Sequence, residues 1–223
     1  MEIRWLNAVI DVPEAFFDVG GAFWRELAAV TFGEVHPDHD EFVHLLPVAG
    51  DMHLELQRIQ SGPASAHLDL LVDDIPGLTE RAVALGAEVI AQPGHAVLAT
   101  PGGVRFCIVP AGTESQRSPL IDTAHPHAVD QICLDVPFDS FISDVAFWAD
   151  LTGWEPNPQV LPEFQSFDQP SRLPLRILLQ RLGPDDNGGG RSHLDLACGA
   201  HVDELTMRHV HHGANVVEVH PRW

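Results

Sequence analysis

The sequence carries the same pattern twice, and this duplication restricts the folds open to the chain more than any other feature. Three segments recur in order at nearly constant spacing: Asp11–Pro13 as Asp135–Pro137, Phe23-Trp24 as Phe147-Trp148, and His67–Leu70 as His193–Leu196. Solenoid repeats are only about 20–50 residues long. A repeating unit of this length therefore indicates a duplicated domain.

The 223 residues suit two domains of roughly 100–120 residues each. We expect a first copy at residues 1–110, a linker at 111–130 that is rich in Ser, Thr, Pro and Gly, and a second copy at 131–223. Hydrophobic residues make up 45% of the chain, which is ample for packed cores and argues against disorder.

Within each copy, hydrophobic periodicity and turn residues predict two β-α-β-β-β modules, and therefore four in the chain. In the first copy we expect helices at Glu14–Ala29 and Ile75–Leu85, and strands at Trp5–Val12, Val30–Val35, Glu41–Leu46, His53–Ile59, His67–Val72, Val89–Ala91, Ala96–Ala99 and Val104–Val109. In the second copy we expect helices at Ser140–Leu151 and Val202–His212, extended runs up to Arg181, and strands at Gln131–Val136, His193–Ala197 and Asn215–Val219.

The fourth module ends early. Counterparts of Ala96–Ala99 and Val104–Val109 do not appear before Trp223, so this module lacks about two strands. The resulting sheet edge needs a cover or a partner. We expect the natural chain to continue beyond Trp223.

The formal net charge is −20, from 32 acidic and 12 basic residues. Such a chain repels nucleic acid and anionic membranes and favours cations, basic ligands and metal ions. We see no signal peptide and no apolar stretch near the ~18 residues of a membrane span. Three isolated cysteines without CxxC spacing, at 107, 133 and 198, are typical of free thiols in a cytoplasmic protein.

Tandem β-α-β-β-β modules with His-Leu-Asp-Leu-Leu-Val-Asp-Asp (67–74) at a strand-to-helix junction resemble the vicinal oxygen chelate superfamily. That superfamily includes glyoxalase I, bleomycin resistance proteins and extradiol dioxygenases. The resemblance implies an α+β fold in which paired modules form two cupped, half-barrel mixed sheets with the helices outside. It also implies that metal ligands come from the first and last strands of each module.

Carried over residue by residue, these ligand positions are occupied in the first copy by Asn7, Glu55, His67 and Cys107. In the second copy they are Gln131, Leu178 and His193, and the fourth position is missing. The superfamily normally uses His, Gln and Glu. Leu178 cannot bind a metal, so we expect the first copy to carry the more functional site.

Strand alternation supports a polar cup independently of the resemblance, because successive side chains point to opposite faces of a sheet. It places His67 and Asp69 on one face, and likewise His193 and Asp195. The predicted ligand-binding residues are Asn7, Asp11, Glu55, Gln57, His67, Asp69, Cys107, Gln131, Asp135, His193 and Asp195. A few polar groups on an apolar concave surface are typical of a small-molecule site.

Three functions fit this pattern. The first is a protein that binds a small cationic or aromatic molecule in an acidic cleft, without a complete metal site or other cofactor. The second is a lyase, isomerase or dioxygenase that uses zinc, nickel, manganese or iron bound by Glu55 and His67. The third is a scaffold without a ligand. Because the duplication joins in one chain what single-domain relatives build as dimers, a monomer or a homodimer is expected.

Overall fold

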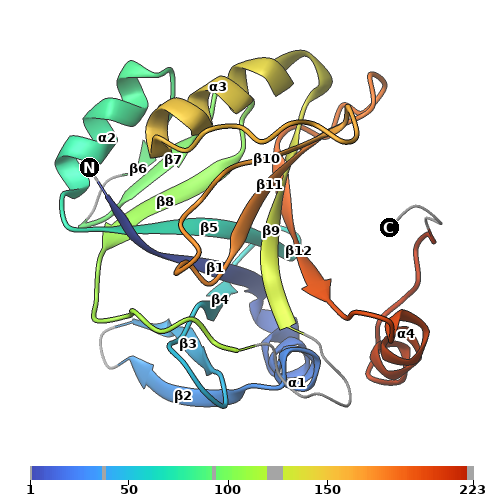
Figure 1. Cartoon of the computed structure of the whole chain (residues 1–223). Coiled ribbons are helices and arrows are strands. Elements are labelled where there is room, and N and C mark those ends of the chain that lie inside the picture. Colours follow the sequence, from blue (N-terminus) through green and yellow to red (C-terminus); the bar gives the residue numbers. More distant parts are fainter. Residues whose placement is uncertain (1, 37–38, 92–93, 120–127, 220–223) are drawn as a thin grey trace.

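The computed structural model describes residues 2–36, 39–91, 94–119 and 128–219, and these residues form two open, mixed β-sheets with helices packed on them (Figure 1). The first sheet contains β1 (Ile3–Pro13), β2 (Thr31–His36), β3 (His39–Leu46), β4 (Leu54–Ile59), β5 (Ser65–Val72), β6 (Glu88–Ala91), β7 (Ala96–Ala99) and β8 (Arg105–Pro110). The second contains β9 (Ala128–Val136), β10 (Phe164–Ser166), β11 (Arg176–Arg181) and β12 (Arg191–Ala197). The helices are α1 (Phe17–Ala28), α2 (Ile75–Ala84), α3 (Phe141–Thr152) and α4 (Val202–His211), with short 3-10 turns at Glu14–Phe16 and Phe138–Ser140. None of the helices in this part of the chain is long and apolar enough to cross a membrane.

The first sheet confirms the two predicted modules of the first copy. Its strand order is β2-β3-β4-β1-β5-β8-β7-β6. The first strand of each module runs parallel to the last strand of that module, β1 beside β4 and β5 beside β8. The antiparallel pair β1–β5 then joins the modules into one continuous sheet.

The second sheet repeats this plan with fewer strands, in the order β10-β11-β9-β12. Among the described residues, the third module has two strands after its helix instead of three, and the fourth has β12 and α4. The predicted strand Asn215–Val219 was wrong: these residues have no regular structure, and Val217 is 95% exposed. In the first copy the equivalent strand β6 pairs with β7. The described residues of the second copy contain no counterpart of β7, and an isolated strand leaves its backbone groups without partners.

Local sequence signals explain where the helix after β5 begins and ends. The Asp74 side chain caps α2 by accepting a hydrogen bond from the Gly77 backbone N–H (3.0 Å), and Pro76 occupies the first turn, where no intrahelical N–H is needed. Gly86, with φ +102°, follows the helix. This left-handed conformation costs glycine little. The predicted helix ended one residue later, at Leu85.

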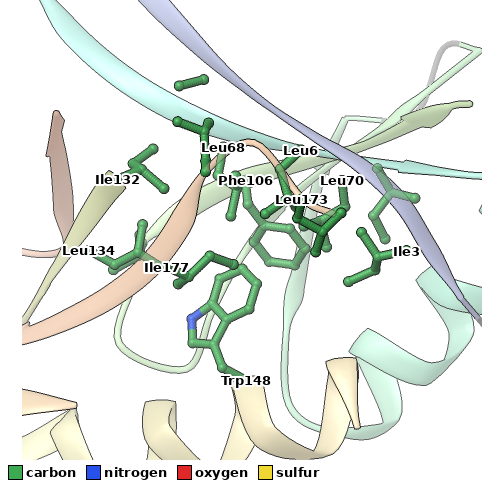
Figure 2. Packing of buried hydrophobic residues seen from close by; sticks show 14 of the residues in the cluster. Ile3, Leu6, Leu68, Leu70, Phe106, Ile132, Leu134, Trp148, Leu173 and Ile177 are labelled. Carbon is green, nitrogen blue, oxygen red and sulfur yellow. The ribbon is translucent and has the colours of Figure 1, made fainter. Parts of the chain in front are cut away.

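One hydrophobic core spans both copies (Figure 2). Helix α3 of the second copy packs against the first sheet, and the ring of Phe106 in β8 lies 5.2 Å from that of Trp148 and 5.9 Å from that of Phe147. Such aromatic contacts contribute about 0.5–1.5 kcal/mol beyond the area they bury. The repeated Phe-Trp pair is therefore a packing element, and in the second copy it packs against the first.

A buried carboxylate fixes α3 against the first copy. Asp144 is fully buried, accepts a hydrogen bond from the Thr100 hydroxyl (2.5 Å), and accepts a second from the Gly102 backbone N–H (2.7 Å). Burial raises the pKa of Asp144, and these two hydrogen bonds partly oppose that rise. The turn between β7 and β8 is therefore tied to the second copy by polar as well as apolar contacts.

Candidate functional site

The two faces of the first sheet have different chemistry. Leu54, Leu56, Leu68 and Leu70 belong to the hydrophobic core, so the alternate residues of β4 and β5 lie on the opposite face. There the register places Val9 between Glu55 and His67, and it places Asp69 between Asn7 and Cys107. We call the face that carries Asn7, Asp11, Glu55, His67, Asp69 and Cys107 the first cup. Gln57 lies on the same face, opposite Asp11.

His67 lies between two carboxylates. Its Nδ1 is 3.1 Å from Asp11 Oδ2, and Asp11 Oδ2 also accepts a hydrogen bond from the Ser65 hydroxyl (2.8 Å). On the other side of the ring, Nε2 is 3.6 Å from Asp69 Oδ1. When His67 is neutral, a proton on Nδ1 is held by Asp11 and the lone pair of Nε2 faces Asp69.

Two further contacts complete the first cup. The Asn7 side-chain amide donates a hydrogen bond to Glu55 Oε1 (3.0 Å). Asp69 interacts with the Cys107 thiol through a side-chain hydrogen bond. Ligand atoms of His67, Asp69 and Cys107 all lie within 4.8 Å of one another, and among the described residues Glu55 is not a member of that group.

Burial and neighbouring charges shift the pKa values of several groups in the first cup. Burial, followed by the charge of Asp69, raises the pKa of Glu55 to about 7. Burial also raises the pKa of Asp69 despite the charge of His67. Burial lowers the pKa of His67, but the hydrogen bond to Asp11 and the charges of the surrounding carboxylates outweigh it, so the pKa of His67 is raised. Burial is the largest cause of both raised acid pKa values, and the raised pKa of His67 reflects the hydrogen bond to Asp11 and the carboxylates around the ring.

Several buried acceptor atoms in the first cup have no donor within the protein. They are Asn7 Oδ1, Asp11 Oδ1 and Asp69 Oδ1. Leaving a buried acceptor unpaired costs free energy. A cation or a ligand with N–H groups would remove that cost, so the geometry and the electrostatics point to the same kind of occupant.

The second copy has a similar but more open arrangement, the second cup, made by Gln131, Cys133, Asp135, His193 and Asp195. His193 Nδ1 is 3.2 Å from Asp135 Oδ2, and His193 Nε2 is 3.5 Å from Asp195 Oδ1. Gln131 donates a hydrogen bond to Asp195 (2.5 Å). The His193 side chain is 45% exposed, against 16% for His67. In the described part of the chain β12 is the last strand on this side of the sheet, so no strand equivalent to β8 covers the ring there.

In the second cup, an arginine lies beside the carboxylate of Asp135. Asp135 lies opposite Arg191 in the register, with Arg191 Nε 3.3 Å from Asp135 Oδ2. The equivalent neighbour of Asp11 is the uncharged Ser65. Leu178 stands beside Cys133, where Glu55 stands beside Val9 in the first copy. The two cups therefore differ in the groups beside their equivalent carboxylates.

Three residues of these cups were missed by the sequence analysis as site candidates: Ser65, Arg191 and Cys133. Cys133 donates a hydrogen bond to Gln180 (3.7 Å) and lies within 4.8 Å of ligand atoms of Asp135 and His193. Ser65 and Arg191 stand two residues before each histidine. The same strand alternation that selected Asp69 and Asp195 therefore places them on the cup face.

Comparison with known proteins identifies the domain family. A family model described as glyoxalase-like domain matches residues 7–109 and 131–223, one match in each copy. No curated protein matches the chain.

Similar solved structures cover 95% of this chain at low sequence identity. They include 2,2',3-trihydroxybiphenyl 1,2-dioxygenase from Sphingomonas wittichii strain RW1 (11% identity, TM-score 0.62, 78% of that chain). They also include the Mn(II)-bound glyoxalase from Novosphingobium aromaticivorans (17%, 0.57, 69% of that chain). A fusion protein of a xylose isomerase-like TIM barrel and 4-hydroxyphenylpyruvate dioxygenase is also similar (16%, 0.58), and there this chain spans only 38% of the length.

The expected resemblance is thereby confirmed at the level of fold. Both copies match the family model, and the paired modules joined through β1–β5 and β9–β12 have the arrangement that the resemblance implied. The chain belongs to the glyoxalase-like domain family, with one matching domain in each copy.

Proposed function

We propose that the first cup binds a divalent metal ion and that the chain uses this ion to act on a small organic molecule, as a metal-dependent lyase, isomerase or dioxygenase. The ligands would be His67, Asp69 and Cys107, with Glu55 beside them. This set shares His67 with the pair expected from the sequence, Glu55 and His67. It adds the Asp69 carboxylate and the Cys107 thiol, which lie close to the His67 ring.

The contact between His67 and Asp69 carries the proposal. The separation of 3.6 Å between Nε2 and Oδ1 is too long for a good hydrogen bond. It is close to the spacing of about 3.3 Å between two ligands of one tetrahedral zinc ion at ordinary bond lengths. The other ring nitrogen is held by Asp11, which is the usual partner arrangement for a metal-binding histidine.

The chemistry of the donor set favours zinc among the divalent ions, because a thiolate is a soft ligand. Burial, followed by the charge of Asp69, raises the pKa of the Cys107 thiol, so metal binding would have to displace its proton. A bound metal would polarise and orient an oxygen atom of the substrate. Glu55, with a pKa of about 7, is suited to exchange a proton with a molecule bound beside it.

Metal content and affinity test this proposal directly. Protein prepared without chelator is analysed for metals, and metal-free protein is then titrated with Zn²⁺, Mn²⁺ and Co²⁺. We expect one tight site that is lost in His67→Ala and retained in the matched variant His193→Ala. The Co²⁺ protein should show a thiolate-to-metal absorption band that disappears in Cys107→Ser. Absence of tight binding, or loss of the site only in His193→Ala, would overturn the proposal.

An organic cation is the second candidate, because the unpaired oxygens Asn7 Oδ1 and Asp11 Oδ1 are suited to accept N–H groups. Equilibrium binding of cationic aromatic molecules to metal-free protein tests this alternative. Binding that competes with Zn²⁺ and weakens in Asp11→Asn would favour it over the metal.

A further inference from the structure

The second sheet has an edge without a partner strand. In the first copy, β5 pairs with β1 on one edge and with β8, in parallel, on the other. The equivalent strand of the second copy, β12, pairs with β9. Among the described residues, which do not include 120–127 of the predicted linker, no strand pairs with the other edge of β12. Unpaired backbone N–H and C=O groups along such an edge are a template for another strand.

The apolar side chains of β12 are also less covered than those of β5. Leu68 and Leu70 of β5 are fully buried, and Leu68 lies opposite Phe106 of β8 in the register. The equivalent residues Leu194 and Leu196 are only partly buried. A strand beside β12 would therefore cover apolar side chains and pair backbone groups at the same time.

The first helix presents a second surface without a cover. In α3 the rings of Phe147 and Trp148 lie 5.5 Å apart at 83°, and both contact Phe106; Figure 2 shows Trp148 beside Phe106. In α1 the equivalent Phe23 and Trp24 form the same edge-on pair, 5.7 Å apart at 84°. The pair in α3 is at most 2% exposed, whereas the pair in α1 is only partly buried. The pair in α1 therefore has the geometry of the pair in α3 without a third ring from the described residues.

The relation between the copies indicates that these two surfaces face the same space. The equivalent strands β5 and β12 lie against each other. A contact between equivalent elements is expected beside a two-fold axis. Exchange of the copies about such an axis converts the contact of α3 with β8 into a contact of α1 with a strand beside β12. The internal repeat thus shows what kind of element would cover both surfaces.

We propose that the free edge of β12 and the Phe23–Trp24 pair of α1 form a docking site for a β-hairpin of another polypeptide. One strand of the hairpin adds in parallel to β12, as β8 adds to β5. An aromatic side chain of that strand packs on the Phe23–Trp24 pair, as Phe106 packs on the pair in α3. Backbone pairing supplies affinity and the aromatic anchor supplies specificity. This site does not depend on the proposed function of the first cup.

The docking site differs from the interface within the chain in one polar contact. Asp144 of α3 accepts hydrogen bonds from Thr100 and Gly102 in the β7–β8 turn, and the equivalent residue of α1 is Gly20. The turn of a hairpin docked on α1 therefore meets no carboxylate there. The net charge of −20 disfavours an acidic partner. The expected partner is an apolar hairpin with one inward aromatic residue and no excess of acidic groups.

The chain's own hairpin, Ala96–Pro110, is the probe. A fluorescently labelled peptide of this sequence, with Cys107→Ser to prevent oxidation, is titrated into the full chain and followed by anisotropy. We expect saturable binding of one peptide per chain and slower hydrogen exchange of the β12 amides in the complex. The same peptide with Phe106→Ala should bind about tenfold or more weakly, because the complex loses a buried ring. Lack of saturable binding, or equal binding of the two peptides, would overturn the inference.

Variants of the protein test the contribution of α1. Phe23→Ala should weaken peptide binding to a similar extent. Val48→Ala removes a side chain that is 79% exposed in the β3–β4 turn and should leave the affinity unchanged. Circular dichroism of each free variant confirms that it is folded. Equal affinities of the two variants would show that α1 is not part of the site.

Sedimentation of the peptide-free protein tests the other occupant, a second copy of the chain. We expect the β12 amides of the free protein to exchange at the same rate at low and high protein concentration. If the chain dimerises, the dimer protects these amides and the peptide fails to dissociate it, the edge is occupied by a second copy and the inference is wrong.

Discussion

At the scale of single residues, one position separates the charge balance of the two cups. Asp11 has Ser65 as its neighbour on the adjacent strand, and Asp135 has Arg191 in the equivalent place. An arginine beside a buried carboxylate supplies the counterion that a bound cation would otherwise provide. Asp11 instead contacts His67 and the Ser65 hydroxyl, and Arg105 acts on it through its charge.

This difference predicts the effect of exchanging the two residues. In Ser65→Arg the guanidinium would reach Asp11 and reduce the negative charge of the first cup, so we expect the affinity for Zn²⁺ to fall at least about tenfold, or ~1.4 kcal/mol. Arg191→Ser should leave the tight site unchanged. Calorimetric titration of both variants measures this, and equal affinities of Ser65→Arg and wild type would contradict the assignment.

The pKa of Glu55 gives a prediction for stability without metal. Its folded-state pKa of about 7 lies above the ordinary value of 4.5 for a glutamate. The folded state therefore binds more protons between these pH values, and the contribution of Glu55 to stability falls as pH rises through that window. Above pH 7, Glu55→Gln should therefore be more stable than wild type, by at most about 3 kcal/mol. Near pH 4 the difference should vanish.

Urea midpoints in the presence of chelator at pH 4, 6 and 8 measure this effect, with Glu14→Gln as the exposed control. A difference that grows towards acid pH would have the wrong sign. Zn²⁺ binding should show the opposite trend and strengthen with rising pH, since protons on Glu55, His67 and Cys107 compete with the metal.

At the scale of secondary-structure elements, α3 and its counterpart α1 pack against different parts of the molecule despite their shared sequence pattern. Asp144 joins α3 to the β7–β8 turn, and the spacing of the repeat places Gly20 at the equivalent position of α1. A Cβ atom at Gly20 would lie 2.9 Å from a methyl group of Val12. The first helix therefore packs closely on its own sheet, and the third connects the copies.

Removal of the Asp144 carboxylate should destabilise the whole chain. Asp144→Ala leaves the Thr100 hydroxyl and the Gly102 N–H buried without an acceptor, and we expect a loss of about 2–3 kcal/mol in the free energy of unfolding. The neighbouring Asp139→Ala, in the 3-10 turn before α3, should change it by less than about 0.5 kcal/mol. Equal denaturant midpoints for the two variants would show that Asp144 has no such role.

The helices and strands of the first copy could be predicted from the sequence because the hydrophobic periodicity, the helix-capping residues and the turn residues of each segment indicate the same element. Strand alternation likewise indicated the cup faces, since it depends only on the neighbouring residues of one strand. Which residues lie opposite each other on neighbouring strands depends on strand order and register, and alternation gives neither. The sequence therefore did not indicate that Ser65 lies opposite Asp11 whereas Arg191 lies opposite Asp135. The strand expected at Asn215–Val219 did not form for the same reason: its residues suit a strand, but the described residues contain no strand for it to pair with.

At the scale of the whole molecule, the shared core makes the copies unequal. Trp148 is 1% exposed and packs against Phe106 of the other copy, whereas Trp24 is only partly buried. The same Phe-Trp pair therefore serves different purposes in the two helices. Both tryptophans pack against the core, but the side on which each packs is set by the docking of the copies.

This inequality predicts one cooperative unfolding transition that depends on Trp148. We expect Trp148→Ala to cost about 3–5 kcal/mol and to lower the hydrogen-exchange protection of β5 and β9 equally, since the residue contacts the first copy from the second. Trp24→Ala removes the same side chain from a less buried site and should cost clearly less. Unfolding followed by circular dichroism and hydrogen exchange measures both effects. If Trp148→Ala weakened only β9 while β5 kept full protection, the two copies would be independent folding units, and the interface made by Phe106 would contribute little to stability.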